Sequence, residues 1–277
     1  MEGKYILVYG SASLSCPQER LDRSVEFVRH FTAEVLRQGG GLVVLAGDER
    51  STKDAEGNPH IFDWIVLREV LRHAESTMEP RRTYARVVMS DAAWESKIEL
   101  GNQKILSTLQ QRDVLELKRI PREEFTGGEY RSVQTEWSDG MVALGGGKGT
   151  YICGKGMVDL YKPTLPMDID IGSRSEDGFG ALSLHREFVK VPEDFLPKTH
   201  ELVADKIETL SLQSGDLEAS VVAQRAVELL GRELRRGERR GFLELKPKVR
   251  MLWDRMSDLA KMAGIVRAIE IFKGYLS

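Results

Sequence analysis

The sequence predicts an α/β fold, a doubly wound, Rossmann-like and mostly parallel sheet followed by a small C-terminal all-α region. Three observations predict it. Short apolar runs alternate with amphipathic segments in the part of the chain before Val191. Glycine-rich stretches follow two of the apolar runs, and only helical periodicity is found from His200 onward. Strands that are apolar on both faces are typical of parallel sheets covered by helices on both sides.

Each element can be justified in chain order from its hydrophobic pattern. Runs with the composition of buried strands occupy residues 4–9, 41–46, 85–90, 113–119, 140–144 and 164–169. Amphipathic helices are predicted between them at residues 20–38, 62–74 and 94–111. In the first of these helices Val25, Val28, Phe31 and Val35 recur at helical spacing, and the glycines from Gly39 end it.

The pattern changes near Pro192 and Pro197, which predicts one α/β domain over residues 1–192 and a helical region over residues 198–277. Helices are expected in this second region at residues 200–212, 216–236, 242–255 and 257–275. Pro247 weakens or shifts the third helix, because an interior proline removes a backbone hydrogen bond. We expect the region to be a bundle that serves oligomerisation or partner binding, so the protein is predicted to form a homo-oligomer.

The bulk composition excludes several classes of protein. With 40 Lys and Arg against 43 Asp and Glu, the net charge is −3, which gives no electrostatic reason to expect nucleic-acid binding. The basic run at residues 232–240 is interleaved with glutamates and is expected to be a solvated helix end or, alternatively, a site for an acidic partner. Cys16 and Cys153 are too few for a disulfide framework, and the histidines lack the spacing of metal ligands. We therefore expect no metal and no cofactor.

The N-terminal run indicates a strand and not a signal peptide. No window approaches the roughly 18 apolar residues of a membrane span. A cytoplasmic protein without membrane contact is expected.

Two glycine-rich turns carry the functional prediction. One consists of Gly10, Ser11, Ala12 and Ser13 after the first predicted strand. The other, Gly145, Gly146, Gly147, Lys148, Gly149 and Thr150, follows a late apolar strand. Glycine permits positive φ and leaves backbone amides open to an anion, and a helix that starts near Thr150 would direct its N-terminal amides to the same place. Neither turn matches the Walker or the dinucleotide fingerprint, so the alternative is that the glycines only make tight strand-to-helix connections.

Together the two turns resemble the SLOG superfamily over residues 1–192. This superfamily includes the LOG phosphoribohydrolases, the DNA-processing protein of natural transformation, and nucleotide-sensing domains of bacterial immunity proteins. The hydrolase branch carries a catalytic glutamate shortly after the Gly-Thr pair, where this chain has Cys153. It also carries an Arg-Lys pair on a preceding helix, for which this chain offers Lys97 without an adjacent arginine.

The resemblance implies binding more than turnover, because a neutral thiol cannot replace a carboxylate at neutral pH. We therefore expect a nucleotide-binding sensor or adaptor for a nucleotide or cyclic ADP-ribose-like ligand, with a role in bacterial antiviral defence. The alternative is a LOG-like nucleotide N-glycosidase or phosphoribohydrolase with a modified catalytic set. Its carboxylate would come from Glu95, Asp168 or Asp170, although each is also explained as a solvated acid. Cys153 is expected to be a small buried hydrophobe, since no histidine is designated as its base.

Overall fold

The computed structural model describes residues 1–47, 60–77, 82–96, 98–121, 128–172, 180–201 and 207–238. The chain divides into two units, Met1–Leu234 and Arg235–Ser277. The first unit contains the sheet, its helices and the candidate site. In the second unit only the end of one helix is described.

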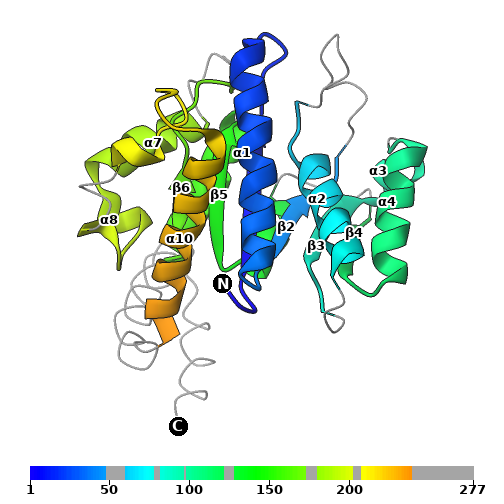
Figure 1. Ribbon diagram of the computed structural model, residues 1–277. Helices are drawn as coiled ribbons and strands as arrows, with labels where there is room; N and C mark the ends of the chain where they lie inside the picture. Colours follow the sequence, from blue (N-terminus) through cyan, green and yellow to red (C-terminus); the bar gives the residue numbers. More distant parts are fainter. Residues whose placement is uncertain are drawn as a thin grey trace, which may run out of the picture. The chain divides into compact units, whose positions relative to one another are not determined.

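The centre of the first unit is a six-stranded sheet in the order β4-β3-β2-β1-β5-β6 (Figure 1). Every pair of neighbouring strands is parallel. The strands are β1 (Tyr5–Ser11), β2 (Gly41–Leu45), β3 (Ala85–Ser90), β4 (Leu115–Ile120), β5 (Gly140–Gly145) and β6 (Thr164–Pro166). The predicted doubly wound, Rossmann-like α/β class is therefore confirmed.

Helices connect the strands. In chain order they are α1 (Gln18–Arg37), α2 (Asp63–Ser76), α3 (Asp91–Ser96), α4 (Leu100–Gln111), α5 (Glu129–Trp137), α6 (Lys148–Asp159), α7 (Ala181–Lys190), α8 (Pro192–Phe195), the 3₁₀ turn η1 (Ile207–Leu210) and α10 (Ala219–Glu238). Helix α2 packs against both α1 and α4, and α1 lies in front of the sheet in Figure 1. Helix α5 contacts α6 and strands β1 to β3. The sheet is thus covered by helices, as its apolar strands require.

The hydrophobic core lies between the sheet and these helices. Every residue of β5 is buried, in keeping with its continuous apolar sequence. Phe27 and Phe31 of α1 stack with ring centroids 5.6 Å apart, and Trp64 of α2 is fully buried. By contrast, the edge strand β4 has several exposed positions along its length, which fits its polar composition. β1 and β5 are inner strands of the sheet, and their carboxyl ends lie side by side.

Each predicted strand has a counterpart in the sheet, within a few residues at either end. The helix predicted at residues 94–111 is wrong as one element, because the chain is non-helical at Ile98 and Glu99 and forms α3 and α4 instead. The amide of Ile98 donates to the carbonyl of Ala93 at 3.2 Å, and the Gln103 side chain donates to the carbonyl of Ile98 at 3.1 Å. These hydrogen bonds satisfy backbone groups at the break. The apolar periodicity of the sequence continues through the break and therefore does not reveal it.

The helix expected at residues 216–236 corresponds to α10. Its buried residues Val222, Ala226 and Leu230 belong to the same hydrophobic core as the sheet. The helices expected at residues 242–255 and 257–275 lie outside the described residues, so the bundle and its role in assembly stay predictions. None of the described helices combines the length and the apolar character that a bilayer crossing requires.

Candidate functional site

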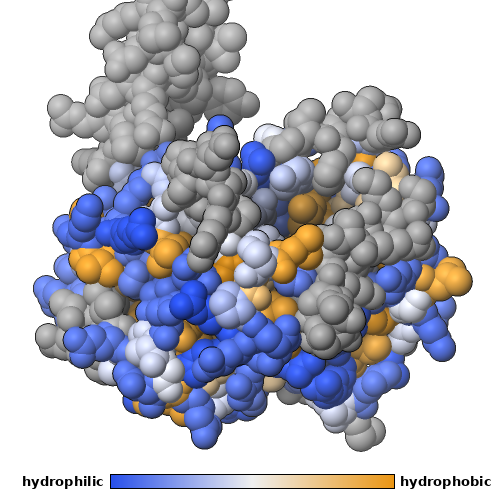
Figure 2. Space-filling model, turned by 90° about the horizontal axis from the view of Figure 1, so that it is seen from above, coloured by the Kyte–Doolittle hydropathy of each residue, from blue (hydrophilic) through white to orange (hydrophobic). Residues whose placement is uncertain are grey.

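The site lies where the direction of strand order reverses. From β1 the chain proceeds outward through β2, β3 and β4, and then returns to place β5 on the other side of β1. Ser11 at the end of β1 is in register with Gly145 at the end of β5. In open parallel sheets, ligands bind at this reversal, outside the carboxyl ends of the strands. Figure 2, which views the molecule from above Figure 1, shows hydrophilic and hydrophobic residues interspersed on that side.

The late glycine turn owes its shape to two residues with positive φ. Gly145 has φ +53° and Gly146 has φ +68°, and residues other than glycine rarely adopt this backbone conformation. The amide of Gly146 donates to the carbonyl of Ser11 at 2.6 Å, which ties the turn to the end of β1. Gly147 then precedes the first residue of α6. The turn therefore directs the N-terminal amides of α6 toward the space beside β1.

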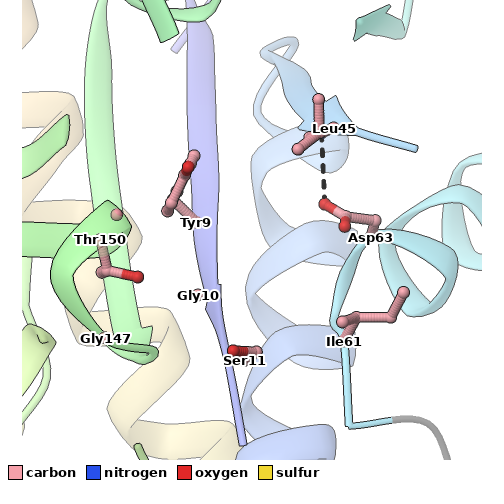
Figure 3. Close-up of a pocket in the computed structure, with 9 residues that line it drawn as sticks. Tyr9, Gly10, Ser11, Leu45, Ile61, Asp63, Gly147 and Thr150 are labelled. Carbon is pink, nitrogen blue, oxygen red and sulfur yellow. Dashed lines mark hydrogen bonds between the residues drawn. The ribbon is translucent and has the colours of Figure 1, made fainter. Parts of the chain in front are cut away.

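A cavity of about 240 Å³ occupies that space (Figure 3). It is lined by residues of β1, of the end of β2, of the start of α2 with the segment before it, and of the start of α6, namely Tyr9, Gly10, Ser11, Leu45, Ile61, Asp63, Gly147, Gly149 and Thr150. In Figure 3, Leu45 and Asp63 lie on one side of β1, and Gly147 and Thr150 lie on the other. The volume is just below the range of about 300 to 1,000 Å³ that is common for small-molecule sites.

Asp63 is the acidic side chain that lines this cavity. It is the first residue of α2, where the helix dipole favours a negative charge. Its Oδ1 accepts a hydrogen bond from the amide of Leu45 at 3.3 Å, so the carboxylate is held at the end of β2. An antiparallel bridge between Ile61 and Ser11 fixes the segment before it against β1. The carboxylate therefore faces the cavity from the side opposite the glycine turn (Figure 3).

Arg131 of α5 places a positive charge beside two residues that line this cavity, Tyr9 and Gly149. A Cβ placed on Gly149 would lie 3.8 Å from both Arg131 Nη2 and Tyr9 Oη, which places these two groups beside the lining residues. The guanidinium donates to Tyr130 Oη at 3.4 Å, and its buried Nε has no hydrogen-bond partner among the described residues. Over the same residues no carboxylate lies within 4.0 Å of Arg131.

Two titratable groups near Arg131, Tyr9 and Cys153, have raised pKa values and are neutral at physiological pH. Burial, followed by the neighbouring Tyr130, raises the pKa of the Tyr9 hydroxyl far above its ordinary value. Burial raises the pKa of the Cys153 thiol to about 12, although the charge of Arg131 opposes this. A cation surrounded by neutral groups, beside helix amides that also carry positive partial charge, favours an anionic ligand.

Cys153 lies in the core beneath the cavity with 2% of its surface exposed. This agrees with its prediction as a small buried hydrophobe. Its raised pKa keeps it a thiol near pH 7, so it cannot act as a nucleophile there.

The predicted ligand-binding residues divide into two groups. Gly10, Ser11, Gly147, Gly149 and Thr150 line the cavity. The others that are described, Ala12, Ser13, Gly145, Gly146 and Lys148, do not line it. Their roles differ: the amides of Ala12 and Ser13 bond to other backbone carbonyls, Gly145 and Gly146 are buried, and the side chain of Lys148 is exposed. Lys97 lies outside the described residues.

The three carboxylates predicted as catalytic candidates lie away from the cavity lining. Asp168 accepts hydrogen bonds from the backbone amides of Leu212 and Gln213, at 2.7 and 3.2 Å. Asp170 forms an ion pair with Arg20 at 3.5 Å. Glu95 is exposed on α3. Among the described residues no group of three or more His, Cys, Asp or Glu side chains could hold a metal ion.

Sequence reasoning missed Asp63 and Arg131. Asp63 follows no recognisable motif, and the signal that could have indicated it is an acid at the first position of a helix that follows a buried strand. Arg131 lies on α5, the helix directly before the strand that leads to the glycine turn, whereas the resemblance points to a basic residue on an earlier helix.

Comparison with known proteins finds a matching family. A family model described as "ATP nucleosidase Cap17-like, N-terminal" matches residues 1–225. Two relatives named ATP nucleosidase Cap17, one from Escherichia coli strain KTE188 and one from Escherichia coli, are each 32% identical to the chain over 230 residues. The matched segment covers 83% of this chain and 45% of each relative, so the chain spans about half the length of the curated relatives it matches.

Proposed function

The chain belongs to the family described as ATP nucleosidase Cap17-like, N-terminal, and from this membership and the cavity we propose that it binds an adenine nucleotide and hydrolyses the bond between base and ribose. The observation that carries the proposal is a cavity with a carboxylate on one wall and helix amides on the other, with the cation of Arg131 beside the lining residue Gly149. The relatives are named for a nucleosidase activity on ATP. The predicted membership of the SLOG superfamily and the predicted role in defence are compatible with this function and stay predictions.

The phosphates are assigned to the wall formed by Gly147, Gly149 and Arg131. Backbone amides at the start of α6 point at a bound anion, and a guanidinium can donate two parallel hydrogen bonds to one phosphate. The side chain of Lys148 is exposed, whereas Arg131 lies beside Gly149 and its buried Nε has no hydrogen-bond partner among the described residues. We therefore assign the phosphate contact to Arg131.

The base and ribose are assigned to the wall that contains Asp63. Hydrolysis breaks the bond between ribose C1′ and the base nitrogen, and the oxygen of water bonds to C1′. One proton of that water stays on the new hydroxyl, and the other ends on the departing base. Positive charge develops on the sugar in the transition state, as in other glycosidic cleavages. The Asp63 carboxylate would stabilise that charge and accept the proton of the attacking water.

This assignment answers the main sequence-based argument against turnover. Cys153 stands where the hydrolase branch of the SLOG superfamily has its glutamate. The fold supplies a carboxylate from a different element, at the entrance to α2. The cavity can therefore provide a carboxylate for hydrolysis, although that carboxylate comes from α2 and not from the helix that follows the glycine turn.

The test is release of adenine from ATP, followed by chromatography, in the wild type and in Asp63→Asn. Loss of a general base should reduce the rate by about 100-fold or more while ATP binding is retained. Asp91→Asn is the matched control, because Asp91 is also the first residue of a helix after a strand but pairs with Arg119 at 2.7 Å, outside the cavity lining. An Asp63→Asn variant that releases adenine at the wild-type rate would exclude Asp63 as the catalytic carboxylate.

A second function, ligand sensing without turnover, is favoured by one observation. The match covers only 45% of each relative, so the nucleosidase centre of those proteins can lie in the part that this chain does not match. The cavity would then bind a nucleotide signal. A sensor is stabilised by its nucleotide, by about 2.7 kcal/mol at a concentration of 100 times Kd, and releases no base. Wild-type protein that shows the shift and yields no adenine supports this function over hydrolysis.

A further inference from the structure

The loop that follows β6, residues 167–172, packs tightly on both glycine turns. The amide of Ser13 donates to the carbonyl of Ile171 at 2.6 Å. A Cβ on Gly145 would lie 2.7 Å from Ile171 Cγ1 and 3.2 Å from the amide nitrogen of Gly172. The glycine turn therefore cannot move without moving residues 171 and 172, because close-packed neighbours leave no room for independent displacement.

The opposite side of this loop holds the turn at residues 211–213. The carboxylate of Asp168 accepts hydrogen bonds from the hydroxyl of Ser211 and from the amides of Leu212 and Gln213. The amide of Asp170 donates to Gln213 Oε1 at 3.0 Å. One half-buried carboxylate thus satisfies three donors of a turn that lies more than forty residues further along the chain.

The turn at residues 211–213 leads directly into α10. Arg23 of α1 donates to the carbonyl of Leu212 at 2.6 Å and also to the carbonyl of Leu217. α10 then begins at Ala219, and its residues Val222 and Ala223 are fully buried in the core. A displacement of the turn is therefore passed to the first turn of α10.

We propose that Asp168 couples the nucleotide cavity to α10, so that binding in the cavity changes the stability of residues 211–222. The contact series runs from the glycine turn to residues 171 and 172, then through Asp168 to the turn and the helix. The proposal rests on the proposed function in one respect, that the cavity is where the nucleotide binds. It gives Asp168 a positioning role in place of the catalytic role considered from the sequence. Coupling of this kind is reciprocal, so if nucleotide binding stabilises residues 211–222, the order of residues 211–222 in turn strengthens nucleotide binding.

The experiment is hydrogen–deuterium exchange of the full chain, with and without formycin 5′-triphosphate. The base of this analogue is joined to the ribose through carbon, so it cannot be hydrolysed. In the wild type, the analogue should slow exchange in residues 145–153 and in residues 211–222. In Asp168→Ala, residues 145–153 should still respond, and residues 211–222 should not. Without ligand, Asp168→Ala should speed exchange of residues 145–153 about threefold to tenfold, because residues 171 and 172, which pack on Gly145, lose the support that the Asp168 hydrogen bonds give to their loop.

Asp170→Ala is the matched control. Its carboxylate lies in the same loop but pairs with Arg20, and the backbone bond from Asp170 to Gln213 is unaffected by the substitution. This variant should show the wild-type response in both regions. The proposal is overturned if residues 211–222 respond equally in Asp168→Ala and the wild type, or if residues 145–153 exchange at the wild-type rate in ligand-free Asp168→Ala.

Failure of the proposed function gives a different result. If the analogue protects neither region of the wild type while ligand-free Asp168→Ala loosens residues 145–153, the coupling stands and the nucleotide assignment is wrong.

Discussion

Two glycines of α6 allow the binding role of the cavity to be separated from helix stability. Gly149 is in the first turn of the helix and lines the cavity, whereas a Cβ added to Gly156, further along, would have no described atom within 4 Å. We expect Gly149→Ala and Gly156→Ala each to stabilise the fold by up to about 1 kcal/mol, because alanine has the higher helix propensity. In a unit of this size that gain raises Tm by about 2 to 4 °C.

The two variants should differ in ligand binding. A methyl group on Gly149 would lie 3.8 Å from Arg131 Nη2 and from Tyr9 Oη, an ordinary contact that the fold tolerates. An anion that binds between those groups would have to occupy the same position. Loss of one charge-assisted hydrogen bond costs about 1.5 to 3 kcal/mol, so Kd for ATP should rise by about 10-fold to 100-fold in Gly149→Ala and stay unchanged in Gly156→Ala.

The assay combines thermal unfolding without ligand and calorimetric titration with ATP. A Gly149→Ala variant that is as stable as expected and binds ATP with the wild-type Kd would refute the placement of the phosphates. Equal weakening in Gly156→Ala would instead show that the effect comes from the helix and not from the cavity. Only the difference between the two variants supports the proposed site.

Three further predictions test other parts of the structure. Gly146→Ala should destabilise the protein by about 1 to 3 kcal/mol in urea unfolding, because φ is +68° and the new Cβ would lie 1.9 Å from Thr150 Oγ1; wild-type stability would contradict this. Because burial raises the pKa of Cys153 to about 12, iodoacetamide at neutral pH should leave this thiol unmodified in the native protein, as read by mass spectrometry. Burial alone would raise the pKa of Glu187, but hydrogen bonds from Lys155 and Tyr151 outweigh it and lower the pKa. This stabilisation is present above the ordinary glutamate pKa of about 4.3 and is lost as pH falls through the lower folded value, so urea midpoints should fall more steeply with acidification in the wild type than in Glu187→Gln.

The strands could be predicted from the sequence because their apolar runs are continuous and end at glycine or polar residues. The predicted bounds of β3 are the observed ones, and those of β5 stop one residue short, since Gly145 still pairs with Ser11. The break between α3 and α4 could not be predicted, because it is stabilised by hydrogen bonds of Ile98 that depend on tertiary structure and leave the apolar periodicity intact. Local hydrophobic patterns therefore predict the positions of strands and helices well, but they predict breaks within a helical pattern poorly.

The candidate site was only partly predictable for a related reason. Glycine turns can be recognised locally, since Gly145 and Gly146 need positive φ. The charged groups cannot, because only the order of the strands in the fold brings Asp63 of α2 into the cavity lining and Arg131 of α5 beside it. An aspartate such as Asp168 has the same local appearance as Asp63, and its three hydrogen bonds to a distant turn appear only in the folded chain.

The glycines of the late turn have two different roles, which explains why the turn contains so many of them. Gly145 and Gly146 are buried, and they bend the chain where side chains would collide with Ile171 and Thr150. Gly147 and Gly149 instead line the cavity, where the lack of a side chain keeps the helix amides accessible. A turn that served only to connect β5 and α6 would require the first pair and would tolerate a side chain at Gly149, where a Cβ would meet no atom closer than 3.8 Å. The open position at Gly149 therefore favours a ligand site over a purely structural turn.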